Sequence, residues 1–146
     1  MDHNRITTSI SLKKKKDIWF IHDDLAYRFL VHFELKEKPF GGRVRMFDDG
    51  DVAVLELIEI FRSKKEKLPM VIFAKICCAR FGAWRLVDTL KELGIHIPVV
   101  LISAEPSRTD MNRIEREPLI MGLVPKENDP ASVLNKIEDL LSADVE

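Results

Sequence analysis

Short apolar runs alternate along this chain with stretches in which apolar residues recur at helical spacing. That alternation is typical of parallel strands that are joined by crossover helices. The runs predict five strands, at Ile18–Ile21, Arg43–Phe47, Met70–Ala74, Val99–Ile102 and Ile120–Val124. Strand–helix units account for nearly the whole chain, so we predict one α/β domain with a doubly wound, five-stranded parallel sheet.

The intervening stretches predict five helices, at Leu25–Leu35, Asp51–Phe61, Ala83–Leu93, Ser107–Glu115 and Pro130–Leu141. The first is predicted from the helical spacing of four apolar residues: Leu25, Phe29, Leu30 and Phe33. Gly94 suits the end of the third helix, and Asp129 suits the N-cap of the last. The fourth helix is the most polar of the five.

The chain has 146 residues and a formal net charge of -1, which argues against a broad nucleic-acid-binding face. We interpret its charge run, Lys13–Lys16, as part of a solvated leader. Residues 1–16 are therefore expected to form a flexible tail before a single domain at residues 17–146. No stretch has the apolar length of a membrane span or a secretory signal. We expect a cytoplasmic protein with neither a nucleic-acid nor a membrane partner.

Chemistry in doubly wound sheets is found at the carboxyl ends of the strands. The polar residues that follow the predicted strands are His22, Asp23, Asp24, Lys75, Ser103 and Lys126. Cys77 and Cys78 also follow the third strand, and neighbouring cysteines rarely form a disulfide. Because neither a phosphate-binding glycine loop nor a hydrolase serine motif is present, the sequence predicts no catalytic residues.

Four segments at these positions resemble the receiver domain of two-component response regulators. They are "IWFIHDDLAYRFL", "DDGDVAVLEL", "PVVLISAE" and "GLVPKENDP". The resemblance spans about residues 17–142 and implies a flavodoxin-like (βα)5 fold. It further implies a site in which two acids after the first strand and an aspartate after the third bind Mg²⁺, and in which that third aspartate accepts a phosphoryl group.

The resemblance assigns a position in this site to each candidate, and some positions depart from the family pattern. Ser103 and Lys126 match the hydroxyl and the lysine that contact the phosphoryl group. Asp23 matches the second acid and Asp24 the residue after it, but His22 stands where the family has its first acid. One metal ligand is therefore missing.

The acceptor aspartate is also missing. Counting forward from Pro69 places Lys75 at the acceptor position, whereas counting back from Gly82 places Ala74 there. Neither side chain can form an acyl phosphate. Leu123 replaces the aromatic residue that rotates on activation in the family. The sequence thus predicts a pseudo-receiver that has lost its phosphorylation chemistry.

The charges of the site support this prediction. A working receiver site holds three carboxylates and one lysine, whereas this one holds Asp23 against Lys126 and, if it points inward, Lys75. We therefore expect no metal site and no cofactor, because Mg²⁺ prefers several oxygen ligands. Two alternatives stay open for Lys75: its ammonium takes the place of the metal beside Asp23, or its side chain extends into solvent.

These observations predict a stand-alone atypical receiver that acts through phosphorylation-independent protein binding. The expected partner is a histidine kinase, another signalling protein or a second copy of the chain. By resemblance, the contact face includes Met111, Arg113 and Leu123. The alternative is a receiver with residual phosphotransfer at a non-standard residue, or a thiol-based redox sensor that uses Cys77 and Cys78.

Overall fold

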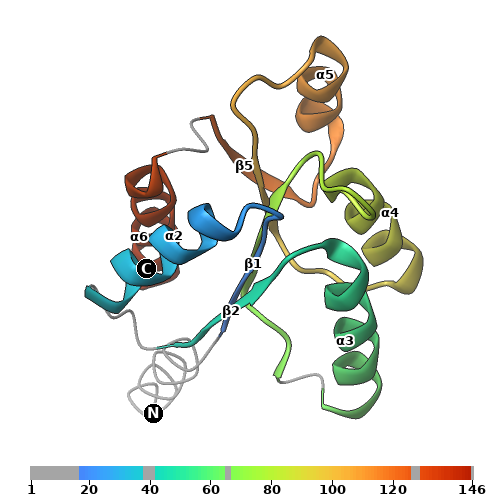
Figure 1. The fold of residues 1–146 in the computed structure, drawn as a ribbon. Helices are drawn as coiled ribbons and strands as arrows, with labels where there is room; N and C mark the ends of the chain where they lie inside the picture. The colour runs from blue at the N-terminus through green and yellow to red at the C-terminus, as the bar shows by residue number, and fades with distance from the viewer. Residues whose placement is uncertain (1–16, 38–41, 65–66, 126–128, 146) are drawn as a thin grey trace.

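A computed structural model describes residues 17–37, 42–64, 67–125 and 129–145. Within them, five parallel strands form one sheet in the order β2-β1-β3-β4-β5 (Figure 1). The strands are β1 (Ile18–Ile21), β2 (Val44–Phe47), β3 (Val71–Lys75), β4 (Val99–Ile102) and β5 (Ile120–Val124). The helices are α2 (Leu25–Glu37), α3 (Gly50–Ser63), α4 (Ala83–Leu93), α5 (Arg108–Arg116) and α6 (Pro130–Val145). The predicted fold class is confirmed.

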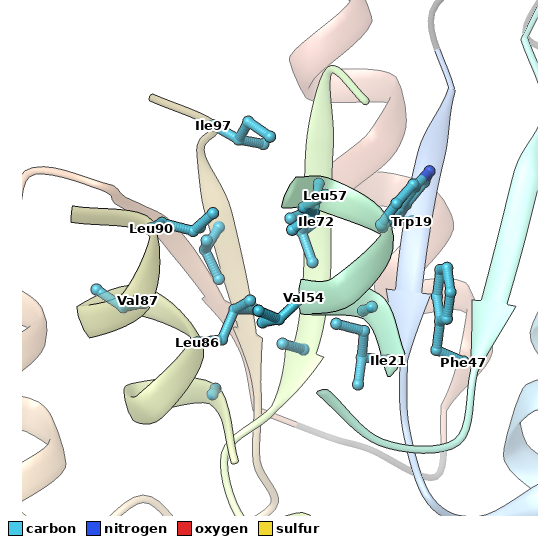
Figure 2. Close-up of a cluster of buried hydrophobic side chains, with 14 of the residues drawn as sticks. Trp19, Ile21, Phe47, Val54, Leu57, Ile72, Leu86, Val87, Leu90 and Ile97 are labelled. Carbon is cyan, nitrogen blue, oxygen red and sulfur yellow. The ribbon is translucent and has the colours of Figure 1, made fainter. Parts of the chain in front are cut away.

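Helices cover both faces of the sheet, with α2 and α6 on one face and α3 and α4 on the other (Figure 1). Successive side chains of a strand point to opposite faces, so each strand contributes to two cores. In β1, Trp19 and Ile21 join the core under α3 and α4 (Figure 2), whereas Ile18 and Phe20 join the core under α2 and α6. The sequence of a strand that is buried on both faces is therefore a continuous apolar run.

The predicted ends of two helices are confirmed. Gly94 follows α4 in the left-handed conformation, with a φ of 72°, and its N–H bonds to carbonyls of the last turn. The carboxylate of Asp129 accepts a hydrogen bond from the N–H of Ala131 at 3.0 Å, as expected of a residue that caps α6.

Helix α2 is present where the sequence predicts it, but it faces the sheet with a different set of residues. The buried side chains are Tyr27, Val31 and Leu35. The apolar side chains whose spacing predicted the helix are exposed: Leu25, Phe29, Leu30 and Phe33. Both sets recur about every four residues, so helix α2 has an apolar stripe on each side. In the described part of the chain, no helix has the length and apolar character needed to cross a bilayer.

Candidate functional site at the carboxyl edge of the sheet

The parallel strands bring most of the predicted site residues to one edge of the sheet. His22, Asp23 and Asp24 follow β1 directly, Lys75 ends β3, and Ser103 follows β4. Strand pairing sets the register of this edge, because Ile21 pairs with Ala74 in β3. Lys126 lies outside the described residues.

An ion pair between Lys75 and Asp23 spans the first and third strands. The Nζ atom of Lys75 donates a hydrogen bond to Oδ1 of Asp23 at 3.0 Å, and both side chains are partly exposed. Ala74 instead lies in the core under α3 and α4. Of the two alternatives for Lys75, the structure therefore has the one in which the ammonium lies beside Asp23. Lys75 rather than Ala74 faces the site.

His22 is fully buried at the same edge. Its Nδ1 accepts a hydrogen bond from the N–H of Asp24 at 3.1 Å and lies 4.0 Å from Oδ1 of Asp23. An accepting Nδ1 places the proton of a neutral imidazole on Nε2. The ring lies against Tyr27, with 4.5 Å between the ring centroids. The buried imidazole of His22 therefore lines the site where the resemblance places a carboxylate.

Asp24 belongs to the start of α2 rather than to the site. Its Oδ1 accepts hydrogen bonds from the N–H groups of Ala26 at 2.9 Å and Tyr27 at 3.3 Å. This is the bonding of an N-cap residue, which satisfies donors that the helix leaves unpaired. Asp23 is then the one acid of the β1 end that faces the site. Among the described residues, no group of three or more His, Cys, Asp or Glu side chains could hold a metal ion.

Ser103, which follows β4, and Leu123, which lies in β5, have modest roles in the structure. Ser103 is half-buried, and its backbone N–H donates to the carbonyl of Val124 at 3.1 Å, which ties the ends of β4 and β5 together. Leu123 is half-buried and packs against the core under α3 and α4. The side chain at the position of the family's aromatic switch is thus part of the core packing.

A residue that the sequence reasoning missed supports the loop between β3 and α4. The carboxylate of buried Asp49 accepts hydrogen bonds from the backbone N–H groups of Gly50 at 2.7 Å, Arg80 at 2.8 Å and Phe81 at 2.7 Å. The first of these bonds caps α3, and the others hold the loop that follows Lys75. An aspartate just before a helix is a signal for the cap, but no local signal indicates the bonds to a loop that is 31 or 32 residues away.

The close approach of this loop also explains the glycine that opens α3. A Cβ atom on Gly50 would lie 2.6 Å from the carbonyl oxygen of Phe81, which leaves no room for a side chain. Arg80 adds an ion pair to Asp51 at 2.8 Å, and this contact lowers the pKa of the Asp51 carboxyl. The string "DDGD" thus forms a docking site for the β3–α4 loop.

The two cysteines lie in this loop and differ in environment. Cys77 is exposed, whereas Cys78 is half-buried. Burial raises the pKa of the Cys78 thiol to about 12, and the nearby carboxylates of Asp23 and Asp49 add to the rise. Because the thiolate is the reactive form, Cys78 at neutral pH is poorly suited to redox chemistry.

Polar contacts with α4 hold α5 in place, and no residue of α5 is buried. Trp84 donates from Nε1 to Asp110 at 2.8 Å, and the Arg113 guanidinium lies 4.5 Å over the Trp84 ring. Arg113 also forms an ion pair with Asp88. Of the three predicted contact residues, Arg113 thus binds α4 and Leu123 packs against the core, while Met111 is exposed.

Acid should weaken a further contact at the junction of these helices. Glu117 is buried and accepts hydrogen bonds from Lys91 at 2.9 Å and from the N–H of Leu119 at 3.3 Å. Burial acts to raise the pKa of Glu117, but these hydrogen bonds outweigh it and leave the pKa below its ordinary value. The carboxylate therefore stabilises the fold above its unfolded pKa of about 4.3, and this contribution is lost as the pH falls through the lower folded pKa.

We therefore expect Glu117→Gln to lower the free energy of unfolding by about 1–2 kcal/mol at neutral pH. The gap between variant and parent should narrow as the pH falls below the unfolded pKa and through the lower folded pKa, because the carboxyl of the folded parent is then protonated as well. Urea unfolding of both proteins at several pH values measures this gap. A gap that is independent of pH would contradict the assignment.

Comparison of the sequence with protein-family models and with curated proteins gives no match. Solved structures, however, match most of the chain. A two-component response regulator from Cytophaga hutchinsonii has a TM-score of 0.71 at 20% identity, over 88% of this chain and 98% of its own. A CheY-like response regulator receiver domain protein from Methanospirillum hungatei JF-1 has a TM-score of 0.71 at 14% identity, over 89% and 96%.

A third similar structure is described as a complex with Mg²⁺. It is the receiver domain of the histidine kinase CKI1 from Arabidopsis thaliana, with a TM-score of 0.66 at 18% identity, over 86% of this chain and 91% of its own. These matches show that the chain has the fold of response-regulator receiver domains.

Proposed function

We propose that this chain is an atypical receiver, a pseudo-receiver of two-component signalling that acts by binding another protein and not by accepting a phosphoryl group. The observation that carries this proposal is the ion pair between Lys75 and Asp23 at 3.0 Å. At the edge of the sheet where the family holds a metal ion and an acceptor carboxylate, this chain has a lysine ammonium facing its remaining acid.

The chemistry of the described residues supports the proposal. An amine cannot form the acyl phosphate of a receiver, and Ala74 in the core has no reactive group. Magnesium usually needs one or two carboxylates in near-octahedral geometry, but Asp24 caps α2 and the Asp23 carboxylate already accepts from Lys75. The Lys75 ammonium also repels a cation that approaches Asp23.

Signalling without phosphorylation requires a protein partner, and by family resemblance this is a histidine kinase or another signalling protein. We place the contact on the face of α5, β5 and α6, which includes Met111, Arg113 and Leu123, and Met111 is one of its exposed apolar side chains. Helix α5 suits recognition because none of its residues is buried and Ile114 alone of its side chains is recorded as packing against the core. We assign no catalytic activity. A redox function is the weaker alternative because Cys78 keeps its proton at neutral pH.

Incubation with acetyl phosphate and Mg²⁺ should leave the intact mass of the protein unchanged. The reason is that the site has no carboxylate at the end of β3 and no set of oxygens to hold the metal. Mass spectrometry measures the outcome, with a phosphorylatable receiver treated in parallel to show that the donor is active. A stable gain of one phosphoryl group that maps to Asp23 would overturn the proposal.

A further inference from the structure

Helix α5 is attached to the domain differently from the other described helices. The backbone of each of the other four packs closely against a neighbouring element, whereas the backbone of α5 does not. In Figure 1, α5 lies clear of α2, α3 and α6. No residue of α5 is buried, and Ile114 packs against the core under α3 and α4 only while partly exposed. Little apolar surface therefore holds α5 to the domain, and elements of this kind open at a lower free energy than the core.

Polar side chains on one face of α4 supply further contacts with α5. Three pairs follow one another in the same order along the two segments, and their α4 members recur every three or four residues, as expected of a single helix face. The pairs are Trp84 with Asp110 at 2.8 Å, Asp88 with Arg113, and Lys91 with Glu117, the residue after α5, at 2.9 Å. We call these three pairs the α4–α5 seam.

The order of charges in the seam favours one register of the two helices. A shift of α5 by one turn in one direction would place Asp110 beside Asp88. The same shift would place Arg113 beside Lys91. A shift in the other direction would place Glu117 beside Asp88. Each shift brings like charges together, which is unfavourable. The motion that remains for α5 is therefore to leave α4 rather than to slide along it.

We propose that α5 is a latch that opens as a unit while the sheet and the other four helices stay folded, and that the α4–α5 seam sets its closed position. Arg113 is the central residue of the latch, because its guanidinium lies 4.5 Å over the Trp84 ring and also binds Asp88. Opening breaks these contacts and uncovers Trp84 and Ile114. The latch belongs to the free chain, so it does not depend on the proposed function. A partner that binds only one of the two states shifts the equilibrium between them.

Hydrogen exchange of the full chain at low urea concentrations, followed by NMR, tests the latch. Amides of α5 should be protected but exchange about tenfold or more faster than those of β3 and β4. Their exchange should also depend less on urea, because opening of α5 exposes little surface. Arg113→Gln and Asp88→Asn should each speed exchange in α5 about fivefold or more, because each breaks the seam. The matched control is Arg116→Gln, which should change it less than about twofold, because the Arg116 side chain binds a carbonyl of its own helix.

Reversing the charges tests the seam itself. Asp88→Lys and Arg113→Glu should each speed exchange in α5, and the double variant should exchange more slowly than either, because the pair again has opposite charges. The proposal is overturned if α5 exchanges with the rate and urea dependence of β3 and β4, since the helix then opens only with the whole domain. It is also overturned if α5 is unprotected in the parent, if Arg116→Gln acts as strongly as Arg113→Gln, or if the double variant exchanges no more slowly than the single variants.

Discussion

Replacing Asp49 with alanine should lower the free energy of unfolding by about 3–5 kcal/mol, because it leaves up to three backbone N–H groups in or near the interior without their acceptor. The Asp49 side chain is 1% exposed and accepts from Gly50, Arg80 and Phe81. The change removes the N-cap of α3 and, in the same step, the support of the loop after β3. Chemical denaturation of parent and variant measures the loss.

Two further variants separate the buried hydrogen bonds from the charge. Asp49→Asn keeps one oxygen acceptor but turns an amino group toward a backbone donor. We therefore expect its free energy of unfolding to lie between that of the parent and that of Asp49→Ala. Asp51→Ala removes an exposed acid of the same segment, and its cost should be clearly smaller than that of Asp49→Ala because solvent screens an exposed ion pair. If Asp49→Ala costs no more than Asp51→Ala, the Asp49 carboxylate does not support the loop as described.

The central strands could be predicted from the sequence because strands covered by helices on both faces are apolar along almost their whole length. The side of α2 that faces the sheet could not be predicted in the same way. Its two sets of apolar residues have the same spacing, and the pattern does not tell which set meets the sheet. The aromatic ring of Tyr27 fits under the helix beside Phe20 and His22, whereas Phe29 remains outside.

The location of the candidate site was predictable for a topological reason, since the ends of parallel strands meet at one edge. The directions of its side chains depend on neighbours that are distant in sequence. Lys75 turns inward because Asp23, 52 residues away, provides a carboxylate. Asp24 turns away from the site because the N–H groups at the start of α2 bind its carboxylate. Local composition does not distinguish an acid that faces a site from one that caps a helix.

The Lys75→Asp variant should bind Mg²⁺ with a dissociation constant on the order of 1 mM or below, whereas the parent should show no binding in that range. The change removes the ammonium that contacts Asp23 and places a second carboxylate at the end of β3. At an effective dielectric constant of about 20, each unit charge about 4 Å from a divalent cation contributes roughly 8 kcal/mol before the cost of desolvation. Replacing a repulsive ammonium with an attractive carboxylate is therefore the largest change in the free energy of Mg²⁺ binding.

Lys75→Asn is the matched control, because it has the shape of the aspartate variant without its charge. Isothermal titration calorimetry with MgCl₂ compares the three proteins, and we expect heat of binding from Lys75→Asp alone. Binding of Mg²⁺ by the parent as tight as that of Lys75→Asp would show that the Lys75 ammonium does not stand in for the cation. Binding by Lys75→Asn equal to that of Lys75→Asp would show that removing the lysine is sufficient. The Lys75 ammonium would then prevent Mg²⁺ binding by repulsion alone, and the second carboxylate would not be a ligand of the metal.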